Sequence, residues 1–354
     1  MSRPVTRPTL DDVARLAGVS LATASRVLSP GNRDPRPDLR HRVLAAARSL
    51  NYTTNANARA IARGDTAIVG LIVSDIIDPY FSTIAAGAIR VADEQGVLTT
   101  LADTRRDPRR EIDYLSALRG QRARGVIVVG SRVRDRELQL SFARELAAYR
   151  ASGGRVAVIS QPKLDVDTIA IENKAGSRDL AVALCGLGYR RFAVLGGPVR
   201  LLTAADRRAG FKAGLVSCGA PPPHVVHGDF TRDAAYGAAR ELFTNGPAVD
   251  CVFAVNDVMA VGAMAAARAA GLRLPRDVGV AGFDDITTLR DVVPALTTVR
   301  VPLYEMGVTA MRRVLDPATT PGVQRIPCEV VIRDSTARTR GRPAATQPAG
   351  RGRQ

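Results

Sequence analysis

Arginine supplies nearly all of the positive charge in this chain, and its planar guanidinium is well suited to hydrogen-bond phosphates and guanine edges. The 354 residues include 50 Lys and Arg against 34 Asp and Glu, a formal net charge of +16, and only three of those cations are lysines. Residues 1–64 hold eleven arginines against four aspartates, and further arginines follow Ser335. Basic charge gathered at the two ends favours an acidic partner, with nucleic acid the first candidate, although a GC-rich coding bias would also enrich arginine.

Catalytic and metal-binding chemistry finds little support in the residue types present. The sequence has three histidines, His41, His224 and His227, too scattered to suggest an acid–base set, and it has no nucleophile elbow. No glycine-rich phosphate loop of the G-x-G-x-x-G or G-x-x-x-x-G-K-[ST] type follows an expected strand. The cysteines, which lack C-x-x-C or Cys/His ligand spacing, are Cys185, Cys218, Cys251 and Cys328. We therefore predict reduced thiols in a protein that is not an enzyme and that holds no metal and no cofactor.

Length and hydropathy indicate a globular protein rather than a membrane protein. The apolar fraction is 46% and the mean hydropathy is −0.01. No apolar run approaches the roughly 20 residues that span a membrane, and the N-terminal residues lack the apolar segment of a signal peptide. We therefore expect a cytoplasmic protein of two or three domains that has no membrane partner.

The elements that must position the arginine-rich segment begin at Thr9. Thr9 and Asp12 have the spacing of a capping box, and Gly18 suits the left-handed turn that ends a short helix. Ser20 is placed to cap a second helix, and a third is expected over 37–50. The apolar positions at helical spacing are Leu10, Val13, Ala14, Ala17, Ala24, Val27, Leu28, Leu39, Val43, Ala46 and Leu50. Two short helices joined by a glycine turn, with a third to complete a small core, predict a helix-turn-helix.

The second of these helices turns a distinctive face away from its apolar stripe. That face consists of Leu21, Ala22, Ser25 and Arg26. Small side chains and one arginine suit a helix that lies in the major groove of DNA, with Arg26 against a guanine edge or a phosphate. An ordinary three-helix packing unit is the alternative interpretation.

The segment TLDDVARLAGVSLATASRVLS, residues 9–29, resembles the N-terminal motif of the LacI/GalR transcriptional repressors. The resemblance implies that Leu21, Ala22 and Arg26 contact the bases of double-stranded operator DNA. The positions that it assigns to phosphate contacts are Thr9, Ser20, Thr23 and Ser25. The resemblance also implies a homodimer on a pseudo-palindromic operator, because two half-sites need two DNA-binding domains.

Residues 53–66 form the expected connection to the rest of the chain. Residues 55–63 have helix-forming composition, but an isolated helix of fewer than about 12 residues is marginal in water, so we expect it to fold only on DNA. The resemblance implies a hinge helix in the minor groove, with Asn55, Arg59 and Ile61 at the DNA and Ile61 where the family usually has an intercalating leucine. A plain flexible linker is the alternative, since Thr54 also departs from the family's usual proline.

From residue 67 onward, short apolar β-branched runs alternate with alanine-rich stretches. The runs are AIVGLIVS, GVLTTLA, GVIVVG, RVAVIS, TIAIE, RFAVLG, CVFAV and VGVAGF. Near-continuous apolar strands separated by helices predict doubly wound α/β units, each with a parallel sheet covered on both faces. Ligands bind beyond the carboxyl ends of the strands in such folds, so we expect a binding site there.

The resemblance to LacI/GalR proteins continues to about residue 335, through segments such as DPYFSTIAAGAIRVADEQG and FAVNDVMAVGAMAAARAAGLRLPRDVGVAGFDDI. It implies a periplasmic-binding-protein type I fold, in which two doubly wound parallel-sheet subdomains enclose a small-molecule effector. The residues that it places in the cleft are Asp75, Tyr80, Phe81, Thr203, Arg207, Phe230, Asn256 and Asp284. Planar Arg, Asp and Asn groups hydrogen-bond vicinal hydroxyls while an aromatic ring covers an apolar face, so a sugar is the expected effector. Ser160 and Leu201 stand where some relatives have Asp and Arg, and Leu201 weighs against a purine.

The sequence therefore predicts an all-α helix-turn-helix domain over 1–52, a hinge over 53–66, a two-lobed effector and dimerisation domain over 67–335, and a disordered basic tail over 336–354. The predicted function is that of a DNA-binding transcriptional repressor controlled by a sugar. One competing hypothesis is a regulator that has a vestigial cleft and is controlled by a protein partner. An intact Arg207–Asp284 pair would argue against this hypothesis. A sugar-processing enzyme or binding protein with an accessory DNA domain is a second competing hypothesis, and a general nucleoid protein is a third.

Overall fold

A computed structural model describes residues 8–28, 36–52, 66–318 and 320–337 of the chain. The chain divides into two compact units, residues 1–67 and residues 68–354. In the part of the chain that the structure describes, no helix is both long enough and apolar enough to cross a membrane.

The first unit contains three short helices, α1 (Leu10–Ala17), α2 (Leu21–Leu28) and α3 (Pro37–Ser49). The predicted capping box is confirmed: the Thr9 amide donates to Asp12 Oδ2 at 2.9 Å, and the Asp12 amide donates to Thr9 Oγ1 at 3.3 Å. Gly18 ends α1 with a φ of 63°, as its position in the sequence suggested. The helix-turn-helix geometry thus follows from signals within a few residues of each other.

The core of the first unit is made of small side chains. Its buried members are Val13, Ala14, Ala17, Ala24, Val43, Ala46 and Ala47. Arg42 on α3 fixes the turn between the first two helices, because its guanidinium donates to the carbonyls of Ala17 at 3.1 Å and Gly18 at 2.9 Å. These bonds satisfy carbonyls that the end of α1 leaves without helical partners.

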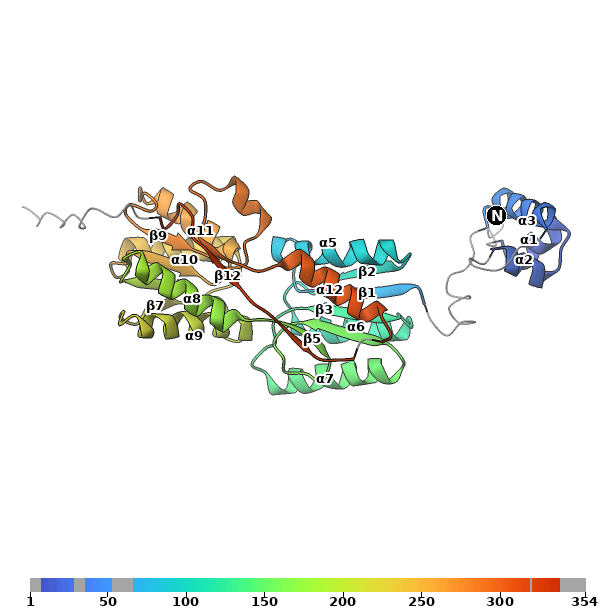
Figure 1. Ribbon diagram of the computed structural model, residues 1–354, viewed down its shortest axis with the longest axis horizontal. Helices are drawn as coiled ribbons and strands as arrows, with labels where there is room; N and C mark the ends of the chain where they lie inside the picture. The colour runs from blue at the N-terminus through green and yellow to red at the C-terminus, as the bar shows by residue number, and fades with distance from the viewer. Residues whose placement is uncertain (1–7, 29–35, 53–65, 319, 338–354) are drawn as a thin grey trace, which may run out of the picture. The chain divides into compact units, whose positions relative to one another are not determined.

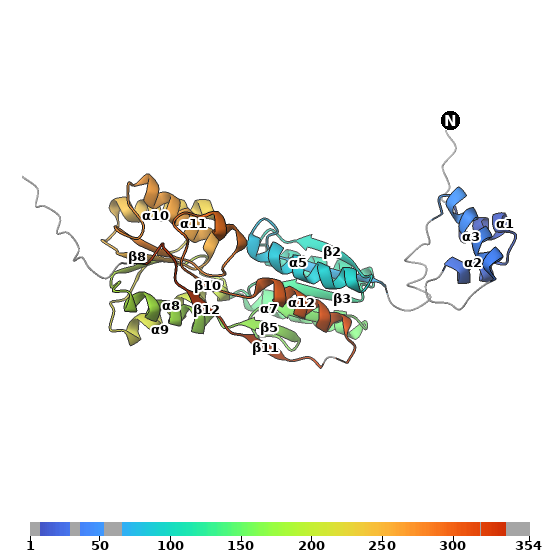
Figure 2. The same ribbon diagram turned by 45° about the horizontal axis from the view of Figure 1, so that its top comes forward.

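The second unit has two lobes (Figures 1 and 2). The lobe that contains the start of this unit is built on a six-stranded parallel sheet. Its strands run in the order β11 (Val323–Ile326), β5 (Asp167–Ile171), β4 (Arg155–Ile159), β3 (Gly125–Val129), β1 (Ile68–Val73) and β2 (Leu98–Asp103). Its helices are α5 (Pro79–Glu94), α12 (Leu303–Leu315), α6 (Pro108–Gly120) and α7 (Arg136–Ala151). The pairs α5/α12 and α6/α7 pack on opposite faces, so successive strand residues alternate between two apolar clusters. We call this the first lobe.

The other lobe, called the second lobe below, repeats the architecture on a smaller sheet. Its parallel strands run in the order β7 (His224–Val226), β6 (Phe192–Leu195), β8 (Cys251–Ala254) and β9 (Gly279–Ala281). The covering helices are α8 (Asn173–Gly186), α9 (Leu202–Ser217), α10 (Arg232–Asn245) and α11 (Asp257–Ala269). A 3-10 turn, η1 (Thr287–Asp291), and an antiparallel pair, β10 (Thr298–Arg300) with β12 (Glu329–Val331), complete it.

Helices α8 and α9 approach each other so closely that only glycine fits at their contact. A Cβ on Gly210 would lie 2.1 Å from the Lys174 carbonyl oxygen, and one on Gly214 would lie 2.4 Å from the Arg178 carbonyl oxygen. Real Cβ atoms do not come that near to backbone oxygen, so a larger residue would push α9 away. This contact sets the middle of α9 beside the start of α8.

The predicted doubly wound fold is confirmed, and all eight expected strands are present. The expectation that both faces would be covered is wrong for β2, whose edge position leaves Leu98 66% exposed and Leu101 42% exposed. Strands β7, β10, β11 and β12 were not expected. They have only three or four residues each, and β7 and β11 are largely exposed, so they lack the apolar run by which a buried strand is recognised.

Candidate functional sites

The outward face of α2 is as the sequence predicted. Ala24 is fully buried, whereas Leu21, Ala22, Ser25 and Arg26 are exposed, with Leu21 at 51%. Ser20 begins the helix, since its Oγ accepts from the Thr23 amide at 3.2 Å and lies 2.8 Å from Thr23 Oγ1. The Arg26 guanidinium donates only to the Ala22 carbonyl, at 3.3 Å, among the contacts of the described residues. It therefore remains available to a ligand.

The remaining DNA-contact positions predicted from the sequence, Asn55, Arg59 and Ile61, lie outside the described residues. Thr9 keeps its hydroxyl in the capping box, 2.7 Å from Asp12 Oδ2. A phosphate contact by Thr9 would share or replace that hydrogen bond.

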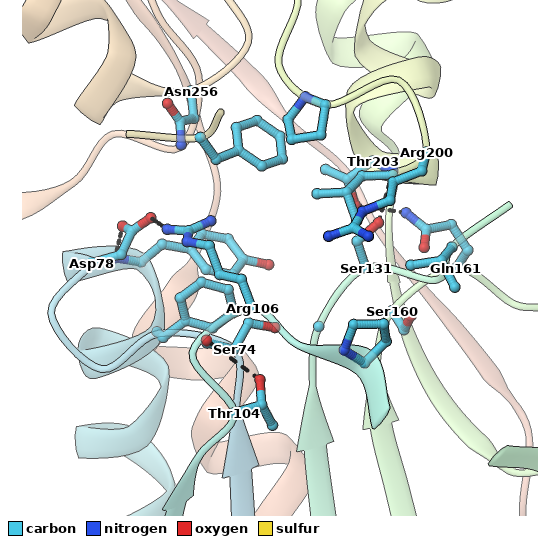
Figure 3. Close-up of a pocket in the computed structure, with 18 of the residues that line it drawn as sticks. Ser74, Asp78, Thr104, Arg106, Ser131, Ser160, Gln161, Arg200, Thr203 and Asn256 are labelled. Carbon is cyan, nitrogen blue, oxygen red and sulfur yellow. Dashed lines mark hydrogen bonds and ion pairs between the residues drawn. The ribbon is translucent and has the colours of Figure 1, made fainter. Parts of the chain in front are cut away.

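A cavity of about 670 Å³ lies between the two lobes of the second unit (Figure 3). Its volume falls within the range typical of small-molecule sites, about 300–1,000 Å³. Ser74, Thr104, Gly130 and Ser160 line it, and each directly follows a strand of the first lobe. The cavity thus occupies the carboxyl edge of the sheet, as expected for a doubly wound fold.

Of the eight cleft residues predicted from the sequence, seven line this cavity. They are Tyr80, Phe81, Thr203, Arg207, Phe230, Asn256 and Asp284. Asp75 does not line it, because its carboxylate is engaged elsewhere: Oδ2 accepts from Arg106 Nε at 3.1 Å and Oδ1 accepts from the Ile77 amide at 3.1 Å. Asp75 therefore positions Arg106 instead of facing the cavity.

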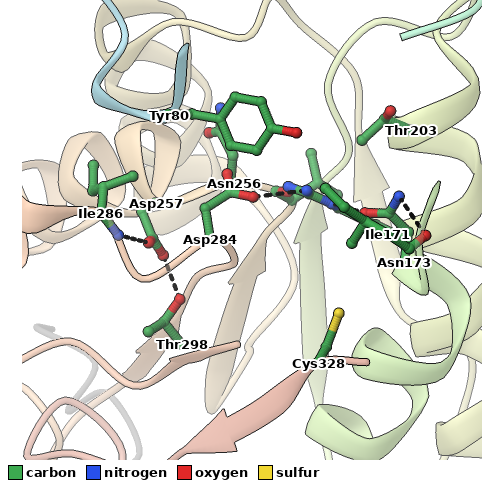
Figure 4. A network of polar contacts seen from close by, with 12 residues as sticks. Tyr80, Ile171, Asn173, Thr203, Asn256, Asp257, Asp284, Ile286, Thr298 and Cys328 are labelled. Atoms are coloured by element: carbon green, nitrogen blue, oxygen red, sulfur yellow. Dashed lines mark hydrogen bonds and ion pairs between the residues drawn. The ribbon is translucent and has the colours of Figure 1, made fainter. Parts of the chain in front are cut away.

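Arg207 is the centre of a buried hydrogen-bonded network on the second lobe, to which Asn173 and Asp284 belong (Figure 4). Its guanidinium donates to Asp284 Oδ1 at 2.7 Å, to Asn173 Oδ1 at 2.8 Å and to the Val255 carbonyl at 2.7 Å. It also lies 3.8 Å from the centre of the Phe283 ring. Because Arg207 and Asp284 are only 2% and 3% exposed, each charge depends on the other to remain in the interior.

Asp284 stands at an unusual point of the backbone. Its φ is 116° and that of Asp285 is 57°, values that L side chains rarely adopt. Burial raises the pKa of Asp284 to about 6, although the neighbouring Arg207 opposes that rise. A strained backbone that points a buried carboxylate into a cavity is typical of a binding site.

Asp257 lies behind this network and does not line the cavity (Figure 4). Its carboxylate accepts from the Ile286 amide at 3.0 Å and from Thr298 Oγ1 at 2.6 Å. Burial, and then the charge of Asp284, raises the pKa of Asp257 to about 7. Asp257 thus fixes the turn that carries Asp284.

The first lobe contributes Arg106, which the sequence analysis missed. Its Nη2 donates to Asp78 Oδ2 at 3.0 Å, and its guanidinium carbon lies 5.9 Å from the ring centres of both Phe81 and Phe230. Asp78 also caps α5 by accepting from the Tyr80 amide at 3.0 Å, and burial raises its pKa. Arg106 therefore joins the aromatic residues of the two lobes at one side of the cavity.

A second buried ion pair supports the floor of the cavity in the first lobe. Arg132 Nη2 donates to Glu111 at 2.9 and 3.1 Å, Arg132 Nε donates to Ser160 Oγ at 3.1 Å, and the guanidinium stacks 4.2 Å from the centre of the Phe142 ring. Burial raises the pKa of Glu111, and the charge of Arg132 opposes that rise. Arg132 was likewise missed.

The two lobes are bonded directly to each other at the opposite side of the cavity from Arg106 (Figure 3). Gln161 Nε2 donates to Thr203 Oγ1 at 2.7 Å, and the Thr203 amide donates to Ser131 Oγ at 3.0 Å. The Arg134 amide donates to the Arg200 carbonyl at 2.8 Å. Thr203 is thus both a cavity residue and a bond between the lobes.

Some of the missed residues had a signal in the sequence. Ser74, Thr104 and Ser160 directly follow apolar runs, so the rule that ligands bind at the carboxyl ends of strands would have found them. Arg106 and Arg132 had none, because arginine is abundant throughout the chain and only the fold identifies the partners of each one.

The arrangement is suited to binding a small polar molecule with one apolar face. Arg207, Asp284 and Asn256 present planar donors and acceptors, while Tyr80 and Phe230 present rings. Among the described residues, no group of three or more His, Cys, Asp and Glu side chains is arranged to hold a metal ion.

Family models match segments of both units of the chain. Residues 9–55 match the family described as bacterial regulatory proteins, lacI family, and residues 181–336 match a periplasmic binding protein-like domain. The ribose operon repressor of Halalkalibacterium halodurans is 32% identical over 332 residues, which cover 93% of this chain and 97% of that protein.

Two solved structures extend the likeness. A complex of the transcriptional regulator CelR with cellobiose is 30% identical, with a TM-score of 0.67 over 93% of this chain and 100% of that one. The lac repressor dimer bound to operator and an anti-inducer is 27% identical, with a TM-score of 0.80 over 94% of this chain and 99% of that one. Matches of this length and identity over both units lead to one conclusion: the chain belongs to the LacI family of bacterial regulatory proteins.

Proposed function

We propose that this protein is a sequence-specific DNA-binding transcriptional repressor whose operator affinity is controlled by a sugar bound between the two lobes of its second unit. It acts as a homodimer on a pseudo-palindromic operator, and it is a regulator, not an enzyme. The observation that carries the proposal is that one chain combines an exposed, arginine-bearing helix-turn-helix face with an interlobe cavity built around the Arg207–Asp284 pair.

The DNA-binding role rests on α2. Its exposed residues Leu21, Ala22 and Arg26 would contact base edges, and Thr9, Ser20, Thr23 and Ser25 would contact phosphates, with Asn55, Arg59 and Ile61 at the minor groove. The lac repressor dimer bound to operator, a structure similar to this chain, supports an operator and a dimer as the partners.

The effector role rests on the chemistry of the cavity. Arg207, Asp284 and Asn256 offer paired hydrogen bonds to vicinal hydroxyls, Thr203 adds a hydroxyl, and Tyr80, Phe81 and Phe230 would cover the apolar side of a sugar ring. The names of two relatives, a ribose operon repressor and a CelR complex with cellobiose, support a sugar as the class of effector.

The coupling between the two roles would arise from the relative position of the lobes. A ligand that contacts Arg207 on the second lobe and Ser160 on the first bridges them, and so competes with or reinforces the direct bond between Gln161 and Thr203. It shifts the population of lobe arrangements and thereby the spacing of the two DNA-binding domains in a dimer. The corresponding domains would be 1–52 for DNA binding, 53–66 for the hinge, 67–335 for effector binding and dimerisation, and 336–354 for a basic tail.

Selection of genomic fragments tests this proposal. Purified full-length protein is mixed with sheared DNA of the source genome, and the bound fragments are sequenced. Enrichment of a two-fold palindrome next to genes for sugar uptake or glycoside cleavage is expected, and the Arg26→Ala variant should lose it. Diffuse enrichment that depends only on salt, equal for both proteins, would contradict sequence-specific repression.

A further inference from the structure

Three arginines gather where the two lobes meet at the side of the cavity away from Arg106. Arg134 follows β3 in the first lobe, Arg200 precedes α9 in the second lobe, and Arg208 lies on α9. The main chains of the two lobes are bonded here, by the Arg134 amide on the Arg200 carbonyl at 2.8 Å and by an antiparallel bridge between Val133 and Leu201. These contacts bring Arg134 and Arg200 together at the lobe junction.

None of these three guanidinium groups forms an ion pair with a carboxylate of the described residues, in contrast to Arg106, Arg132 and Arg207. Arg208 donates to the Gly196 carbonyl, a neutral acceptor. Burial lowers the pKa of Arg208, and so does the positive charge of Arg134 on the other lobe. The positive charges of Arg134 and Arg208, which belong to different lobes, therefore repel each other, and neither has a carboxylate partner among the described residues.

Arg200 is exposed and has no carboxylate partner among the described residues. It is among the residues that line the cavity, on the side of Ser131, Thr203 and Gln161, across from Arg106 and Asp78 (Figure 3). The Thr203 hydroxyl accepts from Gln161, which leaves its own proton to donate, and a hydroxyl beside a guanidinium is a set of donors that holds a phosphate or carboxylate. The Ser131 hydroxyl already donates to the Arg132 carbonyl at 3.0 Å.

The carboxylates that line the cavity do not oppose an acidic ligand at this position. Asp78, Glu111 and Asp284 are each paired with an arginine. Asp229 lines the cavity without a cationic partner among the described residues, and it is exposed to solvent. The arginine-rich side is therefore the part of the cavity where a negative charge gains most.

We propose that the effector is an acidic sugar derivative, whose phosphate or carboxylate group binds Arg200 at the lobe junction while its ring lies against the aromatic residues beside Arg106. This inference rests on the proposed function and specifies the class of its effector. The main chains of Arg200 and Arg134 are hydrogen-bonded across the lobe junction, so an anion that binds both side chains would favour the closed arrangement of the lobes.

The test measures binding to the full-length chain by calorimetry at fixed ionic strength. The probes are ribose, glucose, ribose 5-phosphate, glucose 6-phosphate and glucuronate, with inorganic phosphate as the probe for the acidic group alone. Acidic members should bind more tightly than their neutral counterparts, and Arg200→Gln should weaken them by about tenfold to a hundredfold, the effect of losing a charge-assisted hydrogen bond. Preference for the phosphates or for glucuronate identifies the acidic group.

Arg105→Gln is the matched control, because Arg105 also lines the cavity, is exposed and has no ion pair among the described residues. It should retain the preference for acidic probes. The proposal is overturned if neutral sugars bind as tightly as acidic ones, if Arg200→Gln keeps the preference, or if no acidic probe binds. Operator binding is measured in parallel without and with each probe. Its absence in every condition would contradict the proposed function while leaving the Arg200 result valid.

Discussion

The Arg207 guanidinium and the Asp284 carboxylate form a buried ion pair, with 2.7 Å between Nη2 and Oδ1, at the edge of a cavity that both residues line. Asp284 reaches this position through a strained backbone, and Asn173 and the Val255 carbonyl accept two further hydrogen bonds from Arg207. A pair built in this way is held ready for a ligand, because neither side chain must be reoriented or desolvated when one binds.

We expect Asp284→Asn to abolish most effector binding while operator binding survives. The amide keeps one oxygen for Arg207 but removes the negative charge, and it leaves a buried cation without its counter-charge, which costs up to about 3–5 kcal/mol when a partner is removed entirely. Calorimetry with the effector and fluorescence anisotropy with operator DNA measure the two activities separately. An unchanged effector response would mean that the cavity is assigned incorrectly.

Arg26→Ala should reduce discrimination between operator and unrelated DNA by about 1–3 kcal/mol, the contribution of one good arginine–guanine contact. Effector binding should be unaffected, since Arg26 lies in the other compact unit. Competition binding with operator and scrambled duplexes at one salt concentration measures the effect. Equal losses of DNA and effector binding would contradict the assignment of the two activities to separate units.

Asp257→Asn should change how stability depends on pH. Because burial raises the pKa of Asp257 from 3.8 to about 7, the native state binds a proton that the unfolded chain releases. The stability gained in this way is complete below about pH 4 and is lost as the pH rises through about 7. The free energy of unfolding of the wild type, relative to Asp257→Asn, should therefore fall between these values.

Denaturant unfolding at several pH values measures this difference. Asp277→Asn is the control with the opposite sign, because hydrogen bonds from Arg273 lower the pKa of Asp277 and favour its charged form in the native state. If the difference in free energy of unfolding between the wild type and Asp257→Asn stays constant across the pH range, the result would contradict the buried, proton-binding state of Asp257.

Gly210→Ala should destabilise the second unit by about 1–3 kcal/mol, the usual cost of overpacking, because its methyl group meets the Lys174 carbonyl oxygen. Displacement of α9 should also weaken effector binding, because α9 carries Arg207, which donates a hydrogen bond to Asn173 on α8. Gly237→Ala on α10 is the matched control: nothing lies within 4 Å of its added methyl group, so it should stabilise by about 0.5–1 kcal/mol. Thermal unfolding of both variants checks the pair, and equal effects would contradict the packing argument.

The parts of the fold that could be predicted from the sequence depend on local signals. The Thr9–Asp12 capping box spans three residues, Gly18 ends α1 in the conformation that glycine favours, and Asn256 follows an apolar run at a strand end. Each of these signals is contained within one element and its immediate flank, so no knowledge of the tertiary structure was needed.

The parts that could not be predicted depend on pairs that are distant in sequence. Arg106 meets Asp75 across 31 residues, Gln161 meets Thr203 across 42, and Arg207 meets Asp284 across 77. Family resemblance supplied the last of these pairs, but for Arg106 and Gln161 nothing in the local sequence distinguishes the residue from its many surface counterparts. The resemblance placed Asp75 in the cleft, and its pairing with Arg106 was not visible in the sequence.

The central claim is that ligand in the cavity and DNA on α2 influence each other, and their reciprocal affinities test it most directly. The affinity for operator is measured by anisotropy with and without saturating effector, and the affinity for effector is measured by calorimetry with and without operator. The account predicts that both ratios differ from one and are equal, as linkage requires. Operator affinity that does not change when the cavity is occupied would contradict it.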